Sequence, residues 1–233
     1  MKFTVWNREL DFDIRTKNIT YKNMSFSPDI RTYAQMKDLY NIWPESEKLG
    51  DDFWMYYMYR WVCFSPEDKQ VFEKNHIRYD VTILVPRIIK EEYNKTYGYF
   101  HPANKAWKKY EEIYEVLEWN AIYLQQNDNE TFYTSTIPWD KVVMKEWFGH
   151  VTINSSSTEY LMMANLIDDS FDSEYEKYKE FKWANYLYTD GGWEINKNYK
   201  NKLEIKENYD KFEEVMNIYD EFIADPKKFK FLH

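Results

Sequence analysis

Between residues 53 and 190 the chain alternates short apolar runs with polar turns, and this alternation limits its fold more than any other feature. Each run is rich in β-branched and aromatic residues, and clusters of Asn, Ser, Asp and Pro separate the runs. Many short strands at this spacing predict an all-β sandwich or barrel. The runs are WMYYMYRWVCF, RYDVTILVP, EIYEVLEWNAIYLQ, KVVMKEWF, HVTIN and YLMMANLI.

Helical patterns flank this β region. Residues 1–25 alternate loosely and predict edge strands or an arm, and apolar residues at helical spacing predict a short helix over 31–41. Near the other end, an apolar stripe before Asp225 and Pro226 predicts an amphipathic helix. The stripe consists of Tyr209, Phe212, Val215, Met216, Tyr219, Phe222 and Ile223.

The length of 233 residues suits a single domain. We expect an N-terminal arm with a short helix over 1–52, a β-barrel over 53–190 and a C-terminal extension with a helix over 191–233. With 20% aromatic residues, the chain has large side chains enough to fill a barrel core.

Charge and cysteine content exclude several classes of function. The net charge of −9 argues against binding to nucleic acid, because phosphate backbones are held by clustered basic residues. Cys63 is the only cysteine, so no internal disulfide is possible and a reducing compartment fits. The N-terminus lacks the apolar core of a signal peptide, and Arg60 interrupts the longest apolar cluster. We therefore expect a cytoplasmic protein without membrane association.

Common motifs of nucleotide binding and serine hydrolysis are absent. The chain has no GxGxxG, no GxxxxGK[ST] and no GxSxG. What remains is a set of metal-binding residue types: His101, then Glu112, then His150, which opens HVTIN. On neighbouring antiparallel strands such residues can face one interior and bind Fe, Mn, Zn or Ni. The alternative is two ordinary histidines at strand ends, with structural hydrogen bonds only.

Several blocks of sequence resemble a known family. TYGYFHP, YEEIYEVLE, WFGHVTIN, YLMMANLIDDSFDSEYE and GGWEINKNY occur in the order found in the cupin-type glucose-6-phosphate isomerases. The resemblance covers roughly residues 30–200. It implies a cupin fold, that is, a double-stranded β-helix or jelly-roll barrel with an N-terminal arm and a C-terminal helix, and it implies a homodimer.

The resemblance also implies a set of site residues. The family's metal ligands map to His101, Glu112 and His150, and Tyr99 stands at the position of a fourth ligand, a histidine. Two histidines and one carboxylate can still hold a divalent metal such as Fe, Mn or Zn, but a neutral phenol is a poor ligand. Retention and loss of the metal are therefore both open.

The family's phosphate contacts map to Thr82, Thr96 and Gly98, while Trp147 stands where a tyrosine is common. Ordinary strand threonines are the alternative interpretation of Thr82 and Thr96.

The activity implied by the resemblance is an aldose–ketose isomerisation. Glucose 6-phosphate and fructose 6-phosphate would interconvert through an enediolate, with Glu112 and Tyr114 as the catalytic residues. Two alternatives remain open. One is an isomerase of a different anionic sugar, and the other is a metal-poor, non-catalytic cupin that binds a sugar phosphate or another small ligand. Tyr99 and Trp147 are the residues that favour the non-catalytic alternative.

Overall fold

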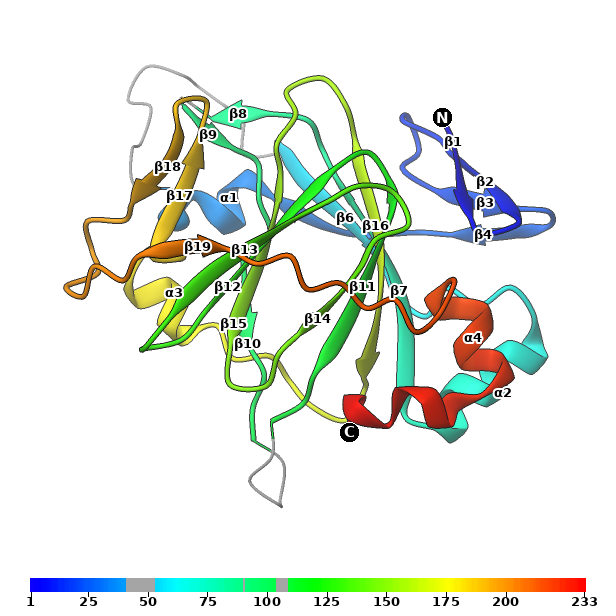
Figure 1. Cartoon of the computed structure of the whole chain (residues 1–233). Helices are drawn as coiled ribbons and strands as arrows, with labels where there is room; N and C mark the ends of the chain where they lie inside the picture. The colour runs from blue at the N-terminus through cyan, green and yellow to red at the C-terminus, as the bar shows by residue number, and fades with distance from the viewer. Residues whose placement is uncertain (41–52, 90, 104–108) are drawn as a thin grey trace.

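Two β-sheets make up the centre of the molecule (Figure 1). The computed structural model describes residues 1–40, 53–89, 91–103 and 109–233. The six-stranded sheet has the order β14 (Lys141–Met144), β11 (Glu112–Glu118), β16 (Leu161–Asp168), β7 (Ile77–Leu84), β6 (Trp54–Tyr59) and β5 (Asp29–Thr32). The five-stranded sheet has the order β10 (Tyr99–Phe100), β15 (Gly149–Asn154), β12 (Ala121–Gln126), β13 (Thr131–Thr136) and β19 (Ile205–Glu207).

Two smaller sheets flank this centre. The N-terminal one consists of β1 (Lys2–Val5), β2 (Arg8–Phe12), β3 (Ile19–Tyr21) and β4 (Met24–Phe26). The other has the order β18 (Gly192–Ile195), β17 (Tyr186–Thr189), β9 (Glu92–Tyr93) and β8 (Ile88–Ile89). Residues 1–25 thus form strands, as the sequence pattern predicted.

All six apolar runs form strands in the central sheets, which confirms the all-β prediction. The run from Glu112 to Gln125 holds both β11 and β12. Strand β13 was missed, because TFYTST has only two large apolar side chains among its threonines and serine. Strand β5 precedes residue 53 and β19 follows residue 190, so both central sheets recruit strands from outside the range 53–190.

Strand β11 separates two apolar clusters. Tyr114 and Val116 pack into a cluster with Leu124 of the five-stranded sheet. Ile113 and Leu117, the alternate residues, pack into the cluster that holds the N-terminal sheet and the C-terminal helices. The two-residue period of a strand therefore gives β11 one face toward the neighbouring sheet and one toward the helices.

Helices are short and lie outside the central sheets. They are α1 (Tyr33–Met36), the 3-10 helix η1 (Lys37–Leu39), α2 (Pro66–Lys74), α3 (Glu176–Glu180), α4 (Ile218–Ala224) and the 3-10 helix η2 (Pro226–Leu232). The first two occupy the predicted segment 31–41, of which residue 41 lies outside the described residues. Within the described ranges, no helix has the length and apolarity needed to cross a membrane.

Helix α2 was not predicted, although its start carries a recognisable signal. The side chain of Ser65 accepts a hydrogen bond of 3.0 Å from the backbone N–H of Asp68, and Pro66 occupies the first turn. Both are typical of a helix N-terminus.

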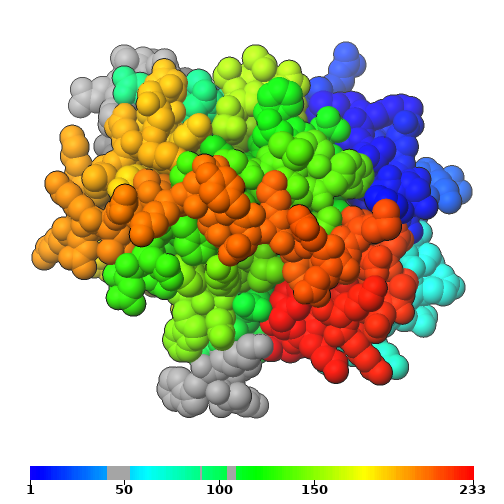
Figure 2. Space-filling view, in the orientation of Figure 1, coloured from blue at the N-terminus to red at the C-terminus, as the bar shows by residue number. Residues whose placement is uncertain are grey.

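The predicted C-terminal helix is wrong in its extent. Figure 2 shows the C-terminal segment, orange to red, running across the face of the molecule seen in Figure 1. Its first part is extended, because β19 pairs with β13 and the N–H of Phe212 donates to the carbonyl of Lys141 at 2.8 Å. The helix begins only at Ile218, where the side chain of Asn217 caps it. Met216, expected on the buried face, is 63% exposed.

The corrected helix predicts unequal effects of two alanine variants. Phe222 is fully buried and stacks on Phe72, with ring centroids 5.1 Å apart. Phe222→Ala should lower the free energy of unfolding by about 3–5 kcal/mol, because it leaves a cavity. Met216→Ala should change it by less than about 0.5 kcal/mol. Urea denaturation measures both, and equal losses would contradict the observed helix start.

Glu115 predicts a pH dependence of stability. Burial raises the pKa of its carboxyl from 4.5 to about 7, although the N–H of Ile218 and the charge of Lys141 oppose the shift. The folded state therefore holds the proton more tightly, and the free energy of unfolding falls as the pH rises from 4.5 through about 7. The full loss is about 3 kcal/mol, at about 1.4 kcal/mol per pKa unit.

Glu115→Gln should remove most of this decrease, because an amide does not ionise. Urea denaturation at several pH values between about 4 and 8 measures it for both proteins. A variant with the same decrease as the original chain would show that other groups cause it.

Candidate functional site

Three buried side chains with metal-binding atoms meet between the two central sheets. Glu112 opens β11 in the six-stranded sheet, His150 lies on β15 in the five-stranded sheet, and His101 follows β10 directly. Each is at most 2% exposed, and one ligand atom from each lies within 4.8 Å of the other two. The structure therefore brings together the three residues that the sequence suggested as metal ligands.

The ligand atoms of this group lie close together, but the hydrogen bonds between them are poorly aligned. The Nε2 atoms of His101 and His150 lie 3.3 and 3.2 Å from Oε2 of Glu112, and neither has a well-aligned hydrogen bond. Nδ1 of His101 lies 2.7 Å from the carbonyl oxygen of Tyr110, which can only accept, so Nδ1 carries the proton. Nε2 of His101 therefore either carries a second proton, which it shares with the carboxylate, or presents a lone pair to the carboxylate oxygen. In the second case, a cation between these atoms would remove that repulsion, so the residues fit a divalent metal.

The surroundings hold Glu112 in its ionised form. Burial alone would raise its pKa, but the two imidazoles outweigh burial and hold the pKa of the carboxyl well below its ordinary value. Burial also lowers the pKa of His150, which favours a neutral, ligating imidazole. Asn165 of β16 donates a hydrogen bond of 2.7 Å from Nδ2 to Oε1 of Glu112 and so orients the carboxylate.

Tyr99 occupies the fourth position as a hydrogen-bond donor. It pairs with His150 across β10 and β15, and its hydroxyl donates to Oε2 of Glu112 at 2.8 Å. Burial, followed by the negative charge of Glu112, raises the pKa of Tyr99 well above 10. The phenol is therefore neutral, and in this arrangement it contacts the carboxylate instead of acting as a phenolate ligand.

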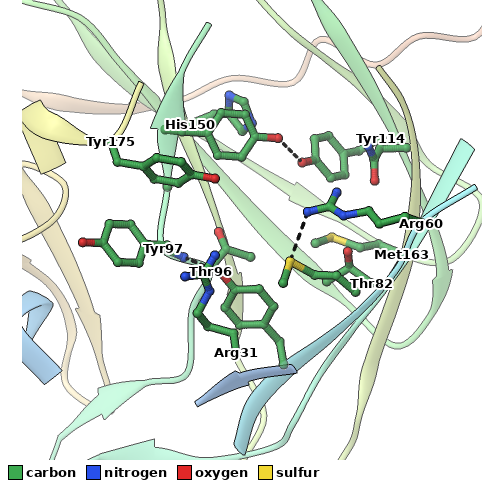
Figure 3. Close-up of a pocket in the computed structure, with 14 residues that line it drawn as sticks. Arg31, Arg60, Thr82, Thr96, Tyr97, Tyr114, His150, Met163 and Tyr175 are labelled. Atoms are coloured by element: carbon green, nitrogen blue, oxygen red, sulfur yellow. Dashed lines mark hydrogen bonds between the residues drawn. The ribbon is translucent and has the colours of Figure 1, made fainter. Parts of the chain in front are cut away.

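A pocket opens beside this group (Figure 3). The empty space within it, counting the open mouth, is about 480 Å³. Six residues singled out from the sequence line it: Thr82, Thr96, Gly98, Tyr99, Tyr114 and His150. His101 and Glu112 are not part of the wall. Tyr99 and Tyr114, whose hydroxyl oxygens are 3.3 Å apart, lie between the pocket and the carboxylate.

Two of the three residues expected to contact phosphate, Thr96 and Gly98, have a structural role as well. Oγ1 of Thr96 accepts a hydrogen bond of 2.9 Å from the N–H of Thr152, which leaves its own proton available to a ligand. Gly98 has φ +80°, and a Cβ there would lie 2.2 Å from Cγ1 of Val151. Packing against β15 therefore requires this glycine even without a ligand.

Trp147 does not line the pocket. It is 50% exposed and borders a separate surface groove with Phe100 and Lys109. The tyrosine that is common at this position is therefore not replaced by a bulky group inside the pocket. Tyr56, Tyr97 and Tyr175 line the pocket instead.

Sequence reasoning missed the two arginines of the pocket wall, Arg31 and Arg60. Arg60 was considered only as a charge that interrupts an apolar cluster. A signal was available, because Tyr56, Met58 and Arg60 alternate along one strand and so share a face. His76, the remaining internal histidine, is largely exposed, lies 3.7 Å from Asp169 and does not belong to the metal-binding group.

Comparison with known proteins gives one family. A family model described as "Glucose-6-phosphate isomerase (GPI)" matches residues 31–204. No curated protein matches the chain.

Solved structures are similar only over part of their length. An oxalate decarboxylase of Lactobacillus farciminis is 16% identical, with 51% of this chain and 30% of that chain covered and a TM-score of 0.38. Vicilin from Capsicum annuum is 12% identical, with 51% and 29% covered and a TM-score of 0.36. Vicilin from hazelnut, Corylus avellana, is 10% identical, with 64% and 32% covered and a TM-score of 0.37. The chain spans about a third or less of each, and similarity at this level carries no information on function.

The convergence of the three ligand atoms predicts a metal-dependent gain in stability. Mn²⁺ or Zn²⁺ at 100 times its Kd should stabilise the protein by about 2.7 kcal/mol. For a chain of this size, that gain raises Tm by roughly 5–10 °C in differential scanning fluorimetry.

Glu112→Gln should lose the gain, because it removes the charged ligand. Glu115→Gln is the matched control, with the same change three residues along β11 on its opposite face, and should keep the gain. Equal gains in both variants would place the metal elsewhere.

Proposed function

Because this chain belongs to the glucose-6-phosphate isomerase family, we propose that it interconverts an aldose phosphate and a ketose phosphate. Glucose 6-phosphate and fructose 6-phosphate are the proposed pair, and an enediolate is the proposed intermediate. The family match covers about three quarters of the chain and, with the two central sheets, confirms the expected cupin fold.

One observation carries the proposal. Tyr99, Tyr114 and His150 line one pocket together with the residues expected at the phosphate, and the ionised carboxylate of Glu112 lies directly behind Tyr99. Isomerisation requires a base beside the substrate carbon and donors or a cation beside its oxygens. Donors line this pocket, and the proposed base lies directly behind them, in contact with Tyr99.

The proposed base is Glu112 and the proposed donor is Tyr114. Glu112 is ionised and so has a lone pair that can receive a proton, whereas burial and the charge of Glu112 raise the pKa of Tyr114 well above 10, so Tyr114 keeps its own proton. Opposite shifts in neighbouring groups are typical of an acid–base pair. Because Tyr99 covers Glu112, we propose that the proton from the substrate carbon passes through the Tyr99 hydroxyl to Oε2 and returns to the neighbouring carbon by the same route.

His101, Glu112 and His150 would hold a divalent metal, which supplies positive charge to the oxygens of the enediolate when bound. The remaining residues bind and orient the ligand. Thr82 and Thr96 offer hydroxyl groups to the phosphate, and Arg31 offers a positive charge on the same side as Thr96 (Figure 3). Among the described residues, no carboxylate forms an ion pair with Arg31, so its charge is available to a ligand.

A non-catalytic binding protein is the second candidate, and Tyr99 favours it. Its hydroxyl already holds the carboxylate that would bind the metal, and the position lacks the ligating histidine of the family. A pocket of this kind can bind a sugar phosphate without converting it.

Variants of Tyr99 separate the two candidates. A coupled assay measures conversion of fructose 6-phosphate by chelator-treated protein and by protein loaded with Mn²⁺, Fe²⁺ or Zn²⁺. The unmodified chain should be active when loaded. Tyr99→His should bind metal more tightly, by at least about tenfold, the smaller of the effects known for changes around metal ligands. Its turnover should nevertheless fall below that of the loaded unmodified chain, because the hydroxyl that passes the proton is lost.

Tyr99→Phe is the matched control, because it removes the hydroxyl and adds no ligand. Tyr99→Phe should not increase the affinity for metal. It should lower turnover by about 10²- to 10⁴-fold, the usual contribution of a group that transfers protons. Metal content is measured by elemental analysis of dialysed protein. Failure of every metal-loaded form to convert fructose 6-phosphate would reject the isomerase in favour of the binding protein.

A further inference from the structure

Arg31 and Arg60 line different parts of the pocket wall. Tyr56, Met58 and Arg60 project from β6 and the residue after it, and all three line the pocket. Arg31 on β5 is paired in register with Tyr56. Since a strand advances about 3.3 Å per residue, the four residues from Tyr56 to Arg60 separate the two arginine positions by roughly 13 Å along the sheet. Figure 3 shows the two side chains entering the pocket from different sides.

The guanidinium of Arg60 is anchored on one side. Its Nη1 donates to Oδ2 of the fully buried Asp80 at 2.6 Å. Nε of Arg78 and the N–H of Trp61 also donate to Asp80, at 2.8 and 3.0 Å. Two arginines thus share one carboxylate, so the cluster keeps a net positive charge. An anchored guanidinium is oriented before a ligand arrives, which reduces the entropy lost on binding.

The other side of the guanidinium has a weak partner. Nη2 lies 3.3 Å from Sδ of Met58, and a thioether is a poor acceptor. This side faces the pocket beside Tyr114, whereas Arg31 lies near Thr96 and Tyr97 (Figure 3). The pocket therefore offers one positive charge beside Thr96 and a second beside Tyr114. Thr82, the other hydroxyl proposed for the phosphate, is paired with Met58 and so lies between the two arginine positions.

We propose that Arg60 is a specificity-determining residue that recognises negative charge at the end of the ligand beside Tyr114, away from Arg31 and Thr96. The preferred ligands are then open-chain sugar phosphates with an anionic group at C1 or C2, such as an aldonate phosphate or the enediolate itself. The orientation of the ligand rests on the proposed function, but the requirement for two anionic groups rests on the two arginines alone. A ligand with a phosphate only would leave the charge of Arg60 without a partner in the pocket.

The alternative is a purely structural role, in which Arg60 only neutralises the charge of Asp80. That role concerns the stability of the sheet and makes no distinction between ligands. A matched pair of ligands therefore separates the two roles: 6-phosphogluconate and glucitol 6-phosphate have the same carbon chain and phosphate, and differ in a carboxylate or a neutral hydroxymethyl group at C1.

Isothermal titration calorimetry on chelator-treated protein measures both affinities without a metal contribution. The unmodified chain should bind 6-phosphogluconate tighter by about tenfold or more, as expected for a hydrogen bond between two charged groups. Arg60→Gln should bring the ratio of affinities close to one. Arg60→Lys should restore part of it, because the charge returns without the paired donors.

Two further variants control for indirect effects. Arg31→Gln should weaken binding of both ligands by a similar factor and leave the ratio unchanged. Arg78 also donates to Asp80 but does not line the pocket. Arg78→Gln should therefore leave the ratio of the two affinities unchanged. Thermal unfolding of each variant identifies any that fail to fold.

An unchanged ratio in Arg60→Gln would overturn the proposal, as would the absence of any preference in the unmodified chain or binding of neither ligand. The outcome is separate from that of the isomerase assay. A preference that depends on Arg60 in a protein without isomerase activity supports the inference and rejects the proposed function. An active isomerase whose ligand preference does not depend on Arg60 supports the proposed function and rejects the inference.

Discussion

The buried, ionised carboxylate of Glu112 is the interaction on which the candidate site depends. A charge without solvent contact is costly unless neighbouring groups compensate it. Asn165 and Tyr99 each donate a hydrogen bond to one of its oxygens, and the two imidazoles lie against Oε2. These four neighbours come from β16, β10, β15 and the segment after β10, so the carboxylate ties the two central sheets together at one point.

Strand β11 carries both the chemistry and part of the core. Glu112 and Glu115 are both buried, yet their pKa values shift in opposite directions. Glu112 faces two imidazoles between the sheets, whereas Glu115 faces the apolar cluster of the C-terminal helices and receives one hydrogen bond from Ile218. Because successive side chains of a strand point to opposite faces, three residues of separation are enough to give two identical carboxyls different environments.

Much of the site could be predicted from the sequence, because several blocks in the same order resemble one family. Histidine is rare here, with four in 233 residues, but acidic residues number 40, so the resemblance and not rarity selects Glu112 as the partner of His101 and His150. Arg60 could not be found in this way, because arginine at a strand end is usual and its role depends on Asp80 in the adjacent strand. The C-terminal helix was wrong for a similar reason: periodicity alone does not reveal that residues 205–207 pair with β13 and that Phe212 is bound to Lys141.

The three candidate ligands follow from the resemblance of several sequence blocks to a known family. The amino-acid sequence by itself determined the β class of the fold and the positions of its principal strands. These depend on local patterns, since side-chain periodicity and turn residues act over a few positions. Only the tertiary structure decided that Tyr99 covers Glu112, that Trp147 lies outside the pocket and that Arg31 and Arg60 line it. Those facts depend on which strands become neighbours and in which register, and pairing between residues distant in the chain is set by the packing of the whole core.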